Sequence, residues 1–132
     1  MFLAPLLRQP DLVWALEEVT SHRTIVSRVH AAVDSASRKR GLLGRTGLDD
    51  TALVIAPCNA VHTFFMRFPI DVLFVDRHGR VLRVAREVPP WRLAAAWRAF
   101  AVIELAAAAA GDITVGDQVG LRAMQAAAPQ RD

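Results

Sequence analysis

Short apolar runs separated by turn residues make up most of the chain, and the clearest of them lie in its middle. Two β-prone runs, 61–66 and 70–76, flank Pro69. The segment Asp76-Arg77-His78-Gly79 follows, with glycine at the last position of a four-residue turn, where it is favoured. This pattern predicts a hairpin whose second strand runs over 80–88.

Similar runs on either side predict further strands. Residues 12–19 favour a strand that is joined by a turn to the next one, but a helix over 10–19 also fits, because the apolar positions follow neither period cleanly. The other expected strands cover 24–30, 52–56, 100–105 and 119–122.

Helical structure is expected in only a few places. Asp34 is a good N-cap residue, and it predicts a short helix from about Ser35 to Leu43 that ends at Gly44. The alanine run 106–110 predicts a helical turn that the following glycine stops. We interpret 93–98 as a loop or helical turn that covers the sheet.

These elements indicate the α+β class. The expected fold is a curled, mostly antiparallel or mixed β-sheet of barrel-like shape with one or two short helices. The length of 132 residues fits a single domain over 1–132. We expect residues 1–10, which include two prolines, and the tail 123–132 to be loose.

Charge and composition argue against several classes of protein. The formal net charge is only +3, and the arginines are scattered along the chain. Nucleic-acid-binding proteins usually concentrate basic residues on one face, so a nucleic-acid partner is not expected. The single cysteine, Cys58, excludes an intrachain disulfide. The N-terminus lacks the basic region of a signal peptide and no apolar run is long enough for a membrane span, which favours a cytoplasmic protein.

Four motifs carry a resemblance to a known family. They are Arg40-Gly41-Leu42-Leu43-Gly44-Arg45, the block from His62 to Asp76, Val102-Ile103-Glu104-Leu105, and Gly116-Asp117. With these motifs the chain is similar to the conserved bacterial and archaeal family known as domain of unknown function 192, over a motif-bearing core of about 38–122. The resemblance implies a shared fold and a set of polar residues in an uncharacterised conserved protein, and it implies no activity. The alanine run 106–110 stands where the family usually has Pro-Ala-Gly.

Asp71 and Arg67 are candidate site residues because both are charged within the apolar centre of the sequence. At the start of a strand, the Asp71 carboxylate can hold a ligand or act as a general base in a cleft. Arg67 can bind an anionic ligand through two hydrogen bonds. Structural roles remain open, because a buried carboxylate needs partners and either backbone N–H groups or Arg67 can provide them.

A hydrolase-type reaction has two candidate pairs of residues. Glu104 interrupts an apolar strand. If its side chain faces the same interior as Asp71, the two residues form paired carboxylates such as glycosidases use. The alternative is that Glu104 faces solvent. Cys58 and His62, with Asn59 between them, can form a nucleophile and its base. These residues are too few for a metal site, and no phosphate-binding or dinucleotide-binding motif is present, so we expect no metal and no cofactor.

The expected site is a polar cleft around Arg67 and Asp71. Trp91, which follows two prolines, forms either an exposed stacking platform with Arg92 or a buried lid. The candidate ligand-binding residues are His62, Thr63, Met66, Arg67, Asp71, Trp91 and Glu104.

The favoured function is a small non-enzymatic ligand-binding or accessory domain with an unknown small-molecule or protein partner. One alternative is a hydrolase-type enzyme that uses Asp71 with Glu104, or Cys58 with His62. Another is a protein-interaction module that pairs with a partner through the sheet edge near 119–122.

Overall fold

The computed structural model describes residues 1–42 and 45–124. Within this part, two short helices, α1 (Ala4–Arg8) and α2 (Ser35–Arg40), accompany ten strands. The strands are β1 (Trp14–Glu18), β2 (Arg23–Val26), β3 (Arg28–Ala32), β4 (Thr51–Ile55), β5 (Ala60–His62), β6 (Ile70–Val75), β7 (Val81–Val88), β8 (Leu93–Ala95), β9 (Ala101–Ala106) and β10 (Val119–Ala123). None of the described helices has the length and apolar character needed to cross a membrane.

The strands form three sheets, of which the largest has five strands in the order β3-β4-β9-β6-β7. Neighbouring strands within this sheet are antiparallel except for β3 and β4, which run parallel and are connected through α2. A mainly antiparallel, mixed sheet with two short helices confirms the α+β class. The barrel-like shape is not confirmed, because the strands belong to separate sheets of five, three and two strands and no closed barrel is formed by the described residues.

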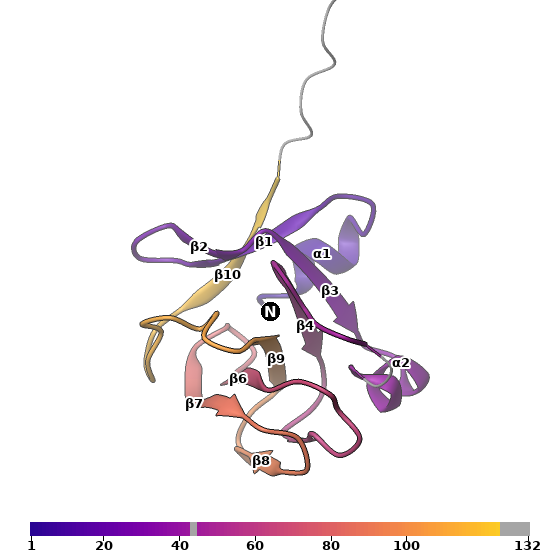
Figure 1. Ribbon diagram of the computed structural model, residues 1–132. Coiled ribbons are helices and arrows are strands. Elements are labelled where there is room, and N and C mark those ends of the chain that lie inside the picture. Colours follow the sequence, from indigo (N-terminus) through magenta and orange to yellow (C-terminus); the bar gives the residue numbers. More distant parts are fainter. Residues whose placement is uncertain (43–44, 125–132) are drawn as a thin grey trace, which may run out of the picture.

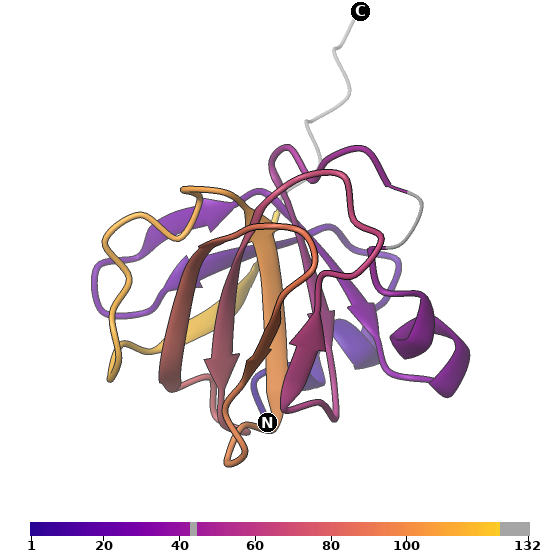
Figure 2. The same ribbon diagram turned by 60° about the horizontal axis from the view of Figure 1, so that its bottom comes forward.

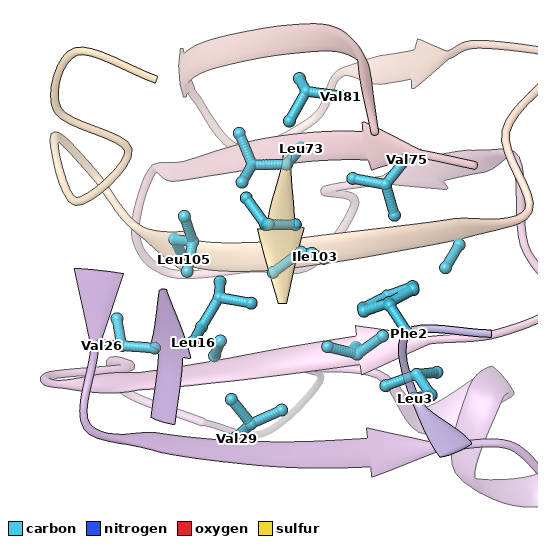
Figure 3. Close-up of a cluster of buried hydrophobic side chains, with 14 of the residues drawn as sticks. Phe2, Leu3, Leu16, Val26, Val29, Leu73, Val75, Val81, Ile103 and Leu105 are labelled. Carbon is cyan, nitrogen blue, oxygen red and sulfur yellow. The ribbon is translucent and has the colours of Figure 1, made fainter. Parts of the chain in front are cut away.

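One face of the five-stranded sheet packs against the three-stranded sheet β10-β1-β2 (Figures 1 and 2). Figure 3 shows Leu16 and Val26 on this smaller sheet pointing toward Leu73 and Ile103 on β6 and β9. These four side chains are almost fully buried. Each such side chain contributes about 1.5–3 kcal/mol to folding, so this layer is the main core.

The opposite face of the five-stranded sheet is covered by loops and by the two-stranded ribbon of β5 and β8. Val72, Phe74 and Val102 of the central strands pack there against Leu42 and Ala94. The central strand β6 is buried over its whole length because both of its faces are covered. The two faces therefore carry separate hydrophobic cores.

The N-terminal segment, expected to be loose, instead packs into the first core. Phe2 and Leu3 are buried, and the Phe2 N–H donates to the Arg77 carbonyl at 2.8 Å. Pro5 lies in the first turn of α1, where its missing N–H is tolerated. Of the tail, Ala123 belongs to β10, and 125–132 lie outside the described residues.

Several predicted elements are confirmed. Residues 14–18 form a strand and not a helix, and Asp34 caps α2 by accepting a hydrogen bond from the Ser37 N–H at 2.8 Å. The Asp76–Gly79 turn joins β6 to β7, with Gly79 at φ 86°, a left-handed conformation that suits glycine.

Other predicted elements are wrong in their limits. The helix ends at Gly41, where φ is 47°, and so stops before the predicted Gly44, which lies outside the described residues. The run 61–66 is a strand only as far as His62, because the chain turns there to meet the loop before β8. Residues 93–95 are a strand, since they pair with β5. Of the run 106–110, Ala106 still belongs to β9, and 107–110 form turns with Ala108 at φ 70°.

Candidate functional site

A cavity of about 90 Å³ lies on the second face of the sheet, between the end of α2, strand β5 and strand β9. Apolar residues of its wall include Leu42, Ile55, Val61 and Met66. Polar and cationic residues complete the lining, and they are Cys58, His62, Glu104, Arg38, Lys39 and Arg40. Lys39 and Arg40 are exposed, so the pocket has positively charged residues at its solvent side.

Glu104 is the buried carboxyl group of this pocket, with 5% of its surface exposed. It comes from the centre of β9, opposite Val72 of β6 and Leu53 of β4, so it points to the same face as the second core. Burial raises the pKa of Glu104 to about 7, and the nearby positive charge of Arg45 opposes this rise. Within residues 1–42 and 45–124, no group donates a hydrogen bond to its carboxylate.

Cys58 and His62 line the same pocket but do not form a nucleophile and base in this structure. The Cys58 thiol donates to the Ala60 carbonyl at 3.1 Å, and the His62 ring lies 5.1 Å from the ring of Phe64. Among the described residues, no group of three or more His, Cys, Asp and Glu side chains is arranged to hold a metal ion.

Asp71 lies on the opposite face of the sheet, where its carboxylate bonds to the backbone. It is completely buried, and its two carboxylate oxygens accept hydrogen bonds from the Glu87 N–H at 2.7 Å and the Ala110 N–H at 3.0 Å. Backbone groups therefore satisfy Asp71, as one of the two structural alternatives predicts. The other alternative, an ion pair with Arg67, does not occur between these two described residues, because Arg67 is exposed to solvent.

The predicted pair of Asp71 with Glu104 is wrong. In the antiparallel register of β6 and β9, Asp71 lies opposite Leu105 while Glu104 lies opposite Val72. Cross-strand partners share a face and successive residues alternate, so the two carboxyl groups point to opposite sides of the sheet.

Thr63 and Trp91 belong to the two loops that flank the β5–β8 ribbon. The buried Thr63 hydroxyl donates to the Pro89 carbonyl at 2.6 Å and accepts from the Arg92 N–H at 2.9 Å, which joins the loops. Trp91 is 56% exposed, so it is no buried lid. Its ring stacks on Phe64 at 5.8 Å and meets Phe65 edge-on at 4.7 Å, as expected for an exposed aromatic platform.

The structure thus brings together only part of the candidate set. His62, Met66 and Glu104 line one pocket, whereas Thr63, Arg67, Asp71 and Trp91 lie elsewhere. The cationic residues of the pocket, Arg38, Lys39 and Arg40, were not predicted as site residues. Their only signal in the sequence is the motif that begins at Arg40, because nothing in the pattern shows that α2 ends beside β9.

The sequence profile of the DUF192 family, described as Uncharacterized ACR, matches residues 17–121. The chain belongs to this family. Three of the DUF192-like motifs meet at the pocket: Arg40 to Leu42 come from the first, His62 and Met66 from the central block, and Glu104 from the Val-Ile-Glu-Leu strand.

Two solved structures resemble this DUF192 chain. A protein of unknown function from Novosphingobium aromaticivorans DSM 12444 is 26% identical with a TM-score of 0.68, over 81% of this chain and 82% of that one. A protein from Sinorhizobium meliloti 1021, described as "a putative transcription regulator", is 21% identical with a TM-score of 0.72, over 83% and 92% of the two chains. The second likeness establishes a shared fold alone. A comparison with curated proteins gives no match.

Proposed function

We propose that this protein is a small non-enzymatic ligand-binding domain and that the pocket around Glu104 is its binding site. The observation that carries the proposal is a buried carboxyl group that opens into a cavity without a cationic side chain bound to it among the described residues. A buried ionisable group without such a partner destabilises a fold, so its presence points to a use other than stability. The centre of the site is therefore Glu104 and not the Arg67–Asp71 cleft.

The lining of the pocket supports a particular chemistry of ligand. Glu104 accepts a hydrogen bond from an ammonium or hydroxyl group when it is ionised, and Arg40 and Lys39 attract an anionic group at the mouth. A small amino acid or hydroxy acid carries both groups. The volume of about 90 Å³ is well below that of pockets for drug-sized ligands, so the site suits a small molecule or the end of a larger one.

Binding is favoured over catalysis by the surroundings of the reactive groups. Among the described residues that line the pocket, Glu104 is the only carboxyl group, and Asp71 lies on the other face, bonded to backbone N–H groups, so the pair that glycoside hydrolysis needs is not formed there. The Cys58 thiol is bonded to a carbonyl and lacks the contact with His62 that a nucleophile needs for activation.

Strand addition at the β10 edge is less well supported. The Val119 N–H donates to the Gly79 carbonyl at 2.9 Å, and the Val81 N–H donates to the Asp117 carbonyl at 2.9 Å. The start of this edge is therefore already bonded within the chain. Only the remainder of β10 is left for a partner strand.

Thermal unfolding with a panel of amino acids, hydroxy acids and sugars tests the proposal. We expect an amino acid or hydroxy acid to raise the melting temperature of the wild type by several degrees at saturation. Glu104→Gln and Arg40→Gln should weaken this ligand at least tenfold, since each removes one of its charged contacts, at about 1.5–3 kcal/mol per contact. Arg67→Gln, an exposed arginine outside the pocket, is the matched control. If no compound acts, or if Glu104→Gln responds like the wild type, the pocket is not a binding site.

A further inference from the structure

Large apolar side chains are exposed on the β5–β8 ribbon and its flanking loops. We call this surface the aromatic face; its members Phe65, Trp91, Leu93 and Trp97 are 71%, 56%, 74% and 79% exposed. The ribbon lies on the side of the five-stranded sheet opposite to the three-stranded sheet (Figures 1 and 2). Single exposed apolar residues are ordinary, but several along one ribbon and the loops at its two ends indicate an interaction surface.

Strand pairing explains why this face is apolar. In the register of β5 with β8, Val61 lies opposite Ala94, and this pair points inward to the second core. The alternate pairs, His62 with Leu93 and Ala60 with Ala95, point outward, and all four of these residues are exposed. Ala60 and His62 also border the pocket of Glu104. Apart from His62, the outward side of the ribbon has no polar side chain.

The loops hold two rings outward in an unusual backbone conformation. Phe65 and Trp91 have φ values of 65° and 68°, which lie in the left-handed region that bulky residues rarely adopt. Such a conformation costs about 1–3 kcal/mol and persists only where the surroundings impose it. Here Thr63 imposes it, because its carbonyl accepts from the Met66 N–H at 3.2 Å and from the Trp91 N–H at 3.0 Å.

The segments that form the aromatic face carry positive charge, and the exposed Glu87 lies just outside them. Residues 56–70 and 88–103 contain no Asp or Glu. They contain Arg67, Arg92 and Arg98, all exposed, and the Arg98 guanidinium lies 5.5 Å from the centre of the Trp97 ring. A partner of this face must therefore offer an apolar environment for the rings, and negative charge on the partner would strengthen binding through the arginines.

We propose that the aromatic face docks on the surface of an anionic lipid bilayer. Trp, Phe and Leu side chains enter the interface between headgroups and acyl chains, and the flanking arginines meet lipid phosphates. A second copy of this chain fits less well, because a two-fold interface sets arginine against arginine. A sugar fits less well, because its hydroxyl groups need polar side chains that the outward side of the ribbon lacks.

Vesicle sedimentation tests the proposal with the full chain. The wild type should bind vesicles that contain equal amounts of phosphatidylglycerol and phosphatidylcholine, and bind much less to phosphatidylcholine alone. Arg92→Gln with Arg98→Gln should lower the partition coefficient on anionic vesicles by about 30-fold. Leu93→Ser with Trp97→Ser should lower it at least about tenfold, and both residues are exposed enough for the fold to remain.

Matched controls distinguish binding through the aromatic face from nonspecific binding through charge or apolar surface elsewhere on the protein. Leu12→Ser with Val115→Ser removes two exposed apolar side chains from other loops and should bind like the wild type. Brominated acyl chains should quench the fluorescence of Trp91 and Trp97 but not that of Trp14, which is buried in the first core. Glu104→Gln should leave vesicle binding unchanged, since the inference does not depend on the ligand pocket.

Three results would overturn the proposal. One is equal binding of the wild type to both kinds of vesicle. Another is wild-type binding by the variant with Leu93→Ser and Trp97→Ser. The third is a dimer in solution that this variant turns into a monomer while no vesicles are bound, since the face would then join two copies of the chain.

Discussion

The buried carboxyl group of Glu104 makes the stability of the fold depend on pH in a predictable direction. Its pKa is raised from an ordinary value of 4.5 to about 7 in the folded protein, because burial disfavours the charged form. Between these two values the folded state binds more protons than the unfolded state. The contribution of Glu104 to stability is therefore complete below pH 4.5 and is lost as the pH rises through about 7.

The size of this loss follows from the same two values. Each pH unit between 4.5 and about 7 changes the free energy of unfolding by about 1.4 kcal/mol, which gives about 3 kcal/mol in all. A loss of this size is a large fraction of the 5–15 kcal/mol that typically stabilises a domain. Glu104→Gln keeps the shape of the side chain without a proton to lose, so the variant should become more stable relative to wild type across this interval.

Urea unfolding of wild type and Glu104→Gln at a series of pH values from 4 to about 8.5 measures the effect. The difference between the two proteins isolates Glu104, because the other carboxyl groups contribute equally to both. Asp34→Asn is a control that should show no pH dependence: the Ser37 N–H lowers the pKa of Asp34 below its ordinary value of 3.8, so the difference between wild type and this variant should stay constant across this pH series. A difference for Glu104→Gln that stays constant from pH 4.5 to 8 would refute the burial of this carboxyl group.

Two further predictions concern the framework of the fold. Asp71→Asn should lower the free energy of unfolding by about 2–4 kcal/mol, because two hydrogen bonds from backbone N–H groups to a buried carboxylate are weakened. Arg67→Met, at an exposed position, should change it by less than about 0.5 kcal/mol. Equal effects of the two substitutions in urea unfolding would mean that the two residues act as a pair. Gly79→Ala should lower the melting temperature strongly, because its added Cβ would lie 2.2 Å from the Val119 carbonyl oxygen at a φ of 86°, whereas Gly47→Ala, with nothing within 4 Å, should melt close to wild type.

Hydrophobic pattern and turn residues were sufficient to predict most strands. The strands around 14–18, 70–75 and 101–106 depend on local sequence, and so do the cap at Asp34 and the Asp76–Gly79 turn. Two of the predictions that were wrong depend on distant contacts. Residues 93–95 become a strand only because β5 lies beside them, and Phe2 and Leu3 are buried only because the N-terminus reaches the turn after β6.

The candidate site was less predictable than the fold, and the reason is the register of β6 and β9. Asp71 and Glu104 are both carboxyl groups within apolar strands, so the sequence gives no basis for assigning different roles to them. A shift of the register by one residue would exchange the faces of every side chain on a strand. Only the pairing of Asp71 with Leu105 and of Val72 with Glu104 puts the first carboxyl group among backbone N–H groups and the second in a pocket.

This division between the faces also explains why the two carboxyl groups should respond differently to substitution. Asp71 is compensated by two N–H groups, so removing its charge leaves those donors poorly satisfied and the fold weaker. Glu104 has no such compensation among the described residues, so removing its charge should stabilise the fold at neutral pH. A carboxyl group whose loss strengthens a protein contributes something other than stability, and the adjoining pocket is the reason we propose ligand binding as the contribution of Glu104.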